Sequence, residues 1–135
     1  MLSFDVNWWA VIAATAVNMF LGAAWYSPAG FGKQWAKLTG KKMESMGGGA
    51  NTGYSVLAAG ALVQSFLLAN IIRDTGTTTV SDGLLLGFMV WLGFVATTTL
   101  GDVAFGGRPW KLWQLNTAYF LVVLVLNGWL LTVWV

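Results

Sequence analysis

The polar side chains inside the apolar stretches of this chain are the residues whose types could do chemistry. They are amides and hydroxyls, with one carboxylate at the end of a stretch: Asn18, Gln64, Asn70, Thr97, Thr98, Thr99, Asn116, Asn127 and Asp102. Amides and hydroxyls in an apolar surrounding either hydrogen bond between helices or line a hydrated path for a solute. We expect Asn18 and Gln64, near the middle of their stretches, to be the first candidates for such a path, followed by Asn127 and the run Thr97–Thr99.

Trp91 and Asp102 are two further residues with a choice of roles. Trp91 is the one tryptophan predicted to lie away from the ends of an apolar stretch, where it either walls a pocket or packs against a glycine. Asp102 is expected to pair with Arg108 or Lys111, because an unpaired carboxylate at the edge of an apolar region is partly desolvated.

The residue types that are absent narrow the possible chemistry. The chain has no Cys and no His, which removes disulfides, thiolate nucleophiles, imidazole bases and the commonest ligands of zinc, copper and haem iron. No Ser–His or paired-carboxylate arrangement stands out either. We therefore expect no enzymatic activity, no cofactor and no metal site.

Four long apolar stretches indicate the elements that must position these residues. Hydrophobic residues make up 57% of the chain and charged ones only 9%, well below the roughly 25% charge of soluble domains. A helix needs about 20 apolar residues to cross a hydrocarbon core of roughly 30 Å. The predicted spans are near 4–26, 52–72, 83–103 and 113–135. The sequence thus predicts an all-α membrane protein, with residues 1–135 forming one four-helix domain.

The positive charges are distributed unevenly between the connections. The first connection carries Lys33, Lys37, Lys41 and Lys42, the second only Arg73, and the third Arg108 and Lys111. Since cytoplasmic loops carry the excess of Lys and Arg, loops 27–51 and 104–112 are predicted to be cytoplasmic and both termini outside. The small net charge of +2 lies at membrane edges, so no nucleic-acid partner is expected.

A short amphipathic helix is predicted between the first two spans. Phe31, Trp35 and Leu38 recur at helical spacing, and lysines occupy the opposite side. The expected interface anchors are Trp25, Tyr26, Lys33, Trp35 and Lys37, with the lysines facing anionic lipid head groups on the cytoplasmic side. The glycine-rich stretch 47–53 is predicted to be a flexible loop.

Small residues four apart form ridges in three of the spans. They are Ala10, Ala14 and Gly22; Ala61, Ser65 and Ala69; and Gly83 with Gly87, continuing in a second register through Gly93, Thr97 and Gly101. Such ridges let helix backbones approach closely in lipid. They serve either packing within the chain or a subunit interface. Because a unit this small has few ways to shield polar side chains, we expect a homo-oligomer.

Two segments resemble a known family. The segment Ala24-Trp25-Tyr26-Ser27-Pro28 precedes Phe31-Gly32-Lys33 and Trp35, and the second half contains Gly87, Trp91-Leu92-Gly93-Phe94, Trp110, Asn116 and Tyr119. Over nearly the whole chain this pattern is similar to domain of unknown function 1761, a family of small four-helix membrane proteins. The resemblance implies four helices in a bacterial or archaeal membrane, here the inner membrane. It transfers no activity and no binding residues.

Two functional hypotheses follow. The first is a homo-oligomeric pore or carrier for a small solute, with Asn18, Gln64, Trp91 and Asn127 facing the path. The second is a non-catalytic accessory or scaffold subunit of a larger membrane complex. A path requires these side chains to face one continuous cavity, whereas a scaffold requires them to pair across helix contacts.

Overall fold

The computed structural model describes residues 2–40 and 50–134, in which helices are the regular secondary structure. Their bounds are α1 Trp8–Trp25, α2 Gly32–Thr39, α3 Ala50–Asp74, α4 Val80–Val90, the π-helical segment η2 Trp91–Ala96, α5 Thr97–Ala104 and α6 Trp110–Val133. Four helices of the described part are long and apolar enough to cross a membrane, namely Trp8–Trp25, Gly53–Asp74, Val80–Ala104 and Trp110–Val133. The predicted all-helical fold with four membrane-length helices is therefore confirmed.

Side-chain caps set the starts of two helices. α1 starts at Trp8, later than predicted, because the Asn7 side chain accepts hydrogen bonds from two backbone N–H groups of the first turn. α4 starts at Val80, earlier than predicted, because the Thr79 hydroxyl accepts from the N–H of Asp82. The predicted spans were thus off by a few residues at the ends where a local cap decides the boundary.

The first connection is shorter than the sequence suggests. α3 begins at Ala50, so the end of the stretch 47–53 is helix and not loop. Residues 41–49 lie outside the described residues, and with them the rest of that predicted loop and the lysines Lys41 and Lys42. α6 likewise begins early, at Trp110, directly after Pro109 with its extended backbone.

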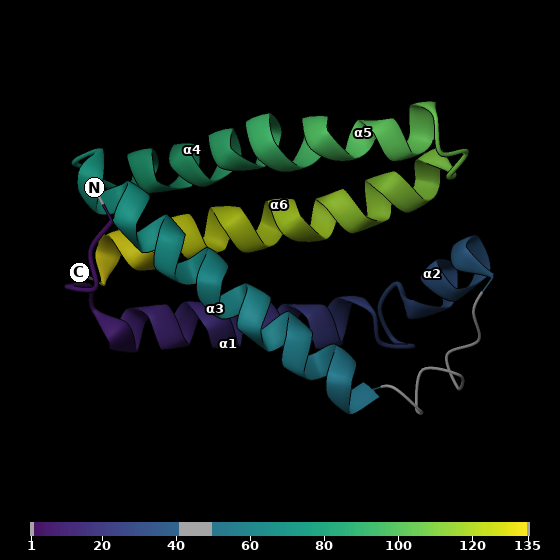
Figure 1. Cartoon of the computed structure of the whole chain (residues 1–135), viewed down its shortest axis with the longest axis horizontal. Coiled ribbons are helices and arrows are strands. Elements are labelled where there is room, and N and C mark those ends of the chain that lie inside the picture. Colours follow the sequence, from purple (N-terminus) through teal and green to yellow (C-terminus); the bar gives the residue numbers. More distant parts are fainter. Residues whose placement is uncertain (1, 41–49, 135) are drawn as a thin grey trace.

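The helix α6 lies at the centre of the bundle. It contacts α1 and α3 on one side, and α4, η2 and α5 on the other. Figure 1 shows α4, η2 and α5 running as one continuous helix beside α6, while α3 crosses α1 and α6 obliquely. Both ends of the chain lie where α3 turns into α4, and α2 lies at the opposite end (Figure 1).

Glycines bring α4 and α6 into backbone contact. Gly83 and Gly87 of α4 face Gly128 of α6, and all three are buried. A Cβ at Gly87 would collide with the carbonyl oxygen of Leu124, and one at Gly83 would lie 2.7 Å from the carbonyl oxygen of Gly128. Close approach of this kind is a leading source of helix association in lipid. The ridge of Gly83 and Gly87 therefore packs against another helix of the same chain.

The segment η2 interrupts the long helix with a wider turn. A π-helix pairs each carbonyl with the N–H five residues on, so its junction with α-helix leaves carbonyls without their regular partners. Hydroxyls of the threonine run reach back to these carbonyls: Thr97 to Gly93 at 2.7 Å, Thr98 to Phe94 at 2.7 Å and Thr99 to Val95 at 2.7 Å. Thr97–Thr99 therefore serve the backbone of their own helix.

Candidate functional site

Asn18 and Gln64, the first candidates for a solute path, hydrogen bond to each other. Asn18 Nδ2 donates to Gln64 Oε1 at 3.0 Å and so joins α1 to α3. From α6, the Tyr119 hydroxyl lies 2.6 Å from Asn18 Oδ1 and 2.7 Å from the Asn18 carbonyl oxygen. Gly22 makes room for this contact, because a Cβ there would lie 2.9 Å from the Tyr119 hydroxyl. Three helices thus meet at one buried polar contact.

Asn127 makes a separate contact between α6 and α1. Its Nδ2 donates to the carbonyl oxygen of Ala14 at 3.2 Å, and the residue is only 1% exposed. Asn127 Oδ1 and the Ser65 hydroxyl of α3 are buried atoms without a hydrogen-bond partner in the described part of the chain. No hydrogen bond of that part joins Asn127 to Asn18 or Gln64.

Trp91 joins η2 to α6. Its indole Nε1 donates to the carbonyl oxygen of Thr117 at 2.7 Å, and its ring lies 5.9 Å from that of Phe88. Trp91 lines neither of the two cavities described below. Its indole therefore fixes the wide turn of η2 against the central helix.

The side chain of Ser27 adds two hydrogen bonds to the backbone bonds of the turn after α1. The Ser27 hydroxyl donates to the carbonyl oxygen of Ala24 at 2.7 Å and accepts from the N–H of Gly30 at 3.2 Å. Pro28 cannot continue the helix, and a Cβ at Gly30 would collide with the Ala24 carbonyl. Serine, proline and glycine are thus the residue types that this turn needs.

The two aromatic residues before this turn dock on α6. Trp25 Nε1 donates to the carbonyl oxygen of Leu115 at 3.2 Å, and the Tyr26 hydroxyl donates to Asn116 Oδ1 at 2.8 Å. The rings of Tyr26 and Tyr119 meet edge to face at 5.6 Å. Tyr26 directly follows α1; burial, and then its neighbour Tyr119, raise the pKa of Tyr26 to about 12.

The predicted interface anchors divide into two groups. Trp35 of α2 packs edge to face on Tyr26 at 6.2 Å, so Trp25, Tyr26 and Trp35 gather around the start of α6. Lys33 and Lys37, in contrast, are exposed on α2. The aromatic members hold the protein together, while the lysines are available to other molecules.

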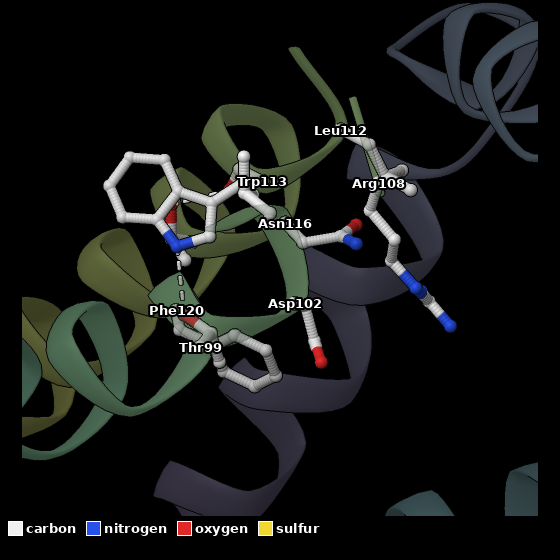
Figure 2. A pocket seen from close by; sticks show the side chains of 9 residues that line it. Thr99, Asp102, Arg108, Leu112, Trp113, Asn116 and Phe120 are labelled. Atoms are coloured by element: carbon white, nitrogen blue, oxygen red, sulfur yellow. Dashed lines mark hydrogen bonds between the residues drawn. The ribbon is translucent and has the colours of Figure 1, made fainter. Parts of the chain in front are cut away.

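A small cavity lies between α5 and α6, next to Asn116. This α5–α6 cavity measures about 80 Å³ and is lined by Thr99, Asp102, Val103, Arg108, Leu112, Trp113, Asn116, Thr117 and Phe120. Trp113 Nε1 donates to Thr99 Oγ1 at 2.9 Å, the dashed line in Figure 2. The predicted pairing of Asp102 is not present: the N–H of Arg108 donates to the Asp102 backbone oxygen at 3.1 Å, and no ion pair joins their side chains in the described part (Figure 2).

The α5–α6 cavity limits what its residues can do. Its volume matches two or three water molecules at about 30 Å³ each, and ligand pockets are typically about 300 Å³ or more. A carboxylate, a guanidinium and an amide line it, but neither a nucleophile with a base nor a metal-ligand cluster is found in the described residues. The geometry suits water or a small ion.

A second cavity, here called the terminal cavity, lies at the other end of the bundle. It measures about 260 Å³ and is lined by Asp5, Val6, Asn7, Ala10, Ala69, Ile72, Arg73, Gly76, Thr77, Thr78, Leu131 and Trp134. The two cavities share no lining residue. The four candidate path residues line neither of them.

A comparison with known families shows to which protein family the chain belongs. The family model described as protein of unknown function (DUF1761) matches residues 9–132. The chain belongs to this family. The resemblance of the Trp-Tyr-Ser-Pro segment to DUF1761 is thereby confirmed, and the match covers all four apolar helices. No curated protein and no solved structure matches the chain.

Sequence reasoning missed the role of Tyr119, which contacts both Asn18 and Tyr26. A signal was present, because Asn116, Tyr119 and Asn127 fall at helical spacing on one face of the DUF1761 protein's last helix. The backbone oxygens that accept from Trp25 and Trp91 carry no such signal, since any residue supplies a carbonyl.

Proposed function

We propose that this DUF1761 protein is a non-enzymatic membrane protein that supplies helices to an assembly as a scaffold or accessory subunit. One observation carries this proposal: Asn18, Gln64, Trp91 and Asn127 each hydrogen bond across a contact between helices. Pairing across helix contacts is what a scaffold requires of them. The lack of Cys and His throughout the chain supports a role without catalysis.

A pore or carrier within one chain receives less support. Its path needs polar groups along one continuous cavity, whereas the four candidate residues line neither the α5–α6 cavity nor the terminal cavity. The test is potassium and glycerol flux in liposomes that contain the wild-type chain or the double variant Asn18→Leu, Gln64→Leu. We expect the two proteins to give equal flux, at the level of empty liposomes. If the wild type gives flux and the double variant does not, the pore hypothesis is favoured instead.

The outward face of η2 and α5 supports assembly. Gly93, Thr97 and Gly101 are exposed, and a Cβ at either glycine would meet nothing within 4 Å. A second copy of the chain is the partner we propose, because one ridge of small residues can pair with the same ridge around a two-fold axis.

Native mass spectrometry from nanodiscs tests this assembly. We expect a homo-oligomer for the wild type and a monomer for Gly93→Leu, Gly101→Leu. The matched control is Gly60→Leu, because Gly60 of α3 also faces open space but lies outside the ridge. An oligomer that survives in the double variant, or one that Gly60→Leu also breaks, contradicts the proposed interface. A different, larger protein in the particle assigns the chain to a mixed complex.

We further propose the orientation in a bacterial inner membrane, with both termini outside. The exposed Lys33 and Lys37 of α2 support it, because they lie at the end of the bundle opposite the termini, where anionic cytoplasmic lipid would meet them. The absence of Cys allows a clean test with single-cysteine variants. A membrane-impermeant maleimide should label Ser81→Cys in intact spheroplasts and Lys37→Cys only after lysis. The reverse pattern overturns the orientation.

A further inference from the structure

The terminal cavity is closed on three sides by elements that hydrogen bonds tie together. The N–H of Ser3 donates to Asn70 Oδ1 at 2.8 Å, which fixes the segment before α1 on the end of α3. Asn7 Nδ2 donates to the carbonyl oxygen of Trp134 at 3.4 Å, which fixes the same segment on the end of α6. The Asn70 side chain is itself held, because its Nδ2 donates to the carbonyl oxygen of Phe66. The cavity is therefore formed before any ligand enters.

The walls of this cavity are apolar and its rim is charged. Val6, Ala10, Ala69, Ile72 and Leu131 supply the apolar surface. With about 260 Å³, the cavity has the volume of about nine water molecules. A short hydrocarbon chain fits its apolar side, because these walls offer dispersion contacts, while Asn7, Thr77 and Thr78 line the remainder.

The two charged groups at the rim are Arg73 and Asp5, and they differ in whether an ion pair balances their charge. The Arg73 guanidinium is 2.9 Å from Asp74 Oδ1 and also donates to Asn70 Oδ1 at 2.8 Å. Asp74 therefore balances its positive charge. The Asp5 carboxylate has neither a hydrogen bond nor an ion pair in the described part of the chain, and only its backbone N–H is held, by the Ser3 hydroxyl. Because Asp5 is exposed, its carboxylate is open to a cationic group at the rim.

We propose that the terminal cavity binds a primary alkylammonium group, with the ammonium at Asp5 and the hydrocarbon between α1, α3 and α6. An ammonium supplies the charge that balances the carboxylate and the donors that it accepts. A hydrocarbon of about six carbons covers the apolar walls. The ammonium can come from a free amine or from the head group of an ethanolamine lipid, and both present the same chemistry to Asp5.

Three six-carbon probes test the site, since they share one apolar chain and differ only in head charge: hexylammonium, hexanoate and hexanol. Their binding to the full chain in phosphatidylcholine nanodiscs is measured by calorimetry, with empty nanodiscs subtracted to remove partition into lipid. We expect saturable binding of hexylammonium alone. Asp5→Asn should weaken it about tenfold, a change equivalent to about 1.4 kcal/mol. Ala69→Leu should abolish it, because the larger side chain fills the cavity.

The matched control is Asp82→Asn, which removes an exposed carboxylate at the start of α4, outside the cavity. This control should bind hexylammonium as the wild type does. The proposal is overturned if hexanoate or hexanol binds as tightly, or if Asp5→Asn binds unchanged. Nanodiscs of phosphatidylethanolamine identify the source: competition with hexylammonium assigns the site to the lipid head group, and undiminished binding assigns it to free amines.

Discussion

The two glycine ridges of the long helix α4–η2–α5 look alike in sequence and differ in use. Gly83 and Gly87 lie against the backbone of α6, where no side chain fits. Gly93 and Gly101, further along the same helix, face open space. Spacing of small residues therefore marks a surface able to pack closely, and the partner decides whether it does so. For the ridge of Gly83 and Gly87, that partner is α6 at Gly128.

The largest effect is expected where a side chain is forced into the inward ridge. In Gly87→Leu the new Cβ meets the Leu124 carbonyl, and backbone cannot move aside as a side chain can. We expect a loss of about 3 kcal/mol of stability or failure to fold, seen as a lower thermal midpoint in detergent. Gly60→Leu, at an open position outside both ridges, is the control and should change stability by less than about 0.5 kcal/mol. Equal losses in the two variants would mean that the close contact of Gly87 with α6 does not stabilise the fold.

An intermediate effect is expected at the polar contact that α1, α3 and α6 share. Asn18→Leu with Gln64→Leu removes two side-chain hydrogen bonds, the one between the amides and the one from Tyr119 to Asn18 Oδ1. Because a hydrogen bond between helices within a membrane contributes about 0.6 kcal/mol, the stability should fall by about 1 kcal/mol. The measurement is chemical unfolding in mixed micelles. An unchanged stability would mean that these amides do not contribute to the packing of α1, α3 and α6.

A smaller effect is expected at Trp91, where the inward ridge gives way to the outward one. Trp91→Phe keeps an aromatic ring but loses the bond to the Thr117 carbonyl, and should cost about 0.6 kcal/mol. Trp129→Phe is matched to it, because the Trp129 indole makes no hydrogen bond in the described residues and should lose less. A larger loss of stability in Trp129→Phe than in Trp91→Phe would mean that the Trp91 hydrogen bond does not stabilise the contact between η2 and α6.

The smallest effect is expected on the exposed face of α5. Thr98→Val loses the bond from its hydroxyl to the Phe94 carbonyl, but the two side chains have similar shapes and Thr98 is exposed. Stability should change by less than about 0.5 kcal/mol. A larger loss in thermal midpoint would show that the threonine run is essential for the π turn and not merely compatible with it.

The four-helix fold was predictable, because the length of an apolar stretch is a property of many residues together. Four membrane-length helices follow from stretches of about 20 apolar residues, and single errors average out. Helix ends were less predictable, since a single side chain such as Asn7 or Thr79 moves them.

The candidate path residues were identified as polar and buried, but their partners were not. Asn18 meets Gln64 because α3 crosses α1 at that depth, and the crossing depends on small residues at several positions. Asn127 and Trp91 bind backbone carbonyls, for which every residue is an equal candidate. The sequence contains the donors, and only the packing selects the acceptors.

The π turn at Trp91–Ala96 fixes how the two halves of the long helix are rotated relative to each other. A π turn holds about one residue more than an α turn and absorbs that residue within one turn. If the same residues closed into regular α-helix, everything beyond them would rotate by about 100° about the helix axis. Thr99 would then leave Trp113, and the outward ridge would turn toward a different neighbour. Deleting one residue from the turn, in contrast, would let it close into α-helix with the two halves still in phase.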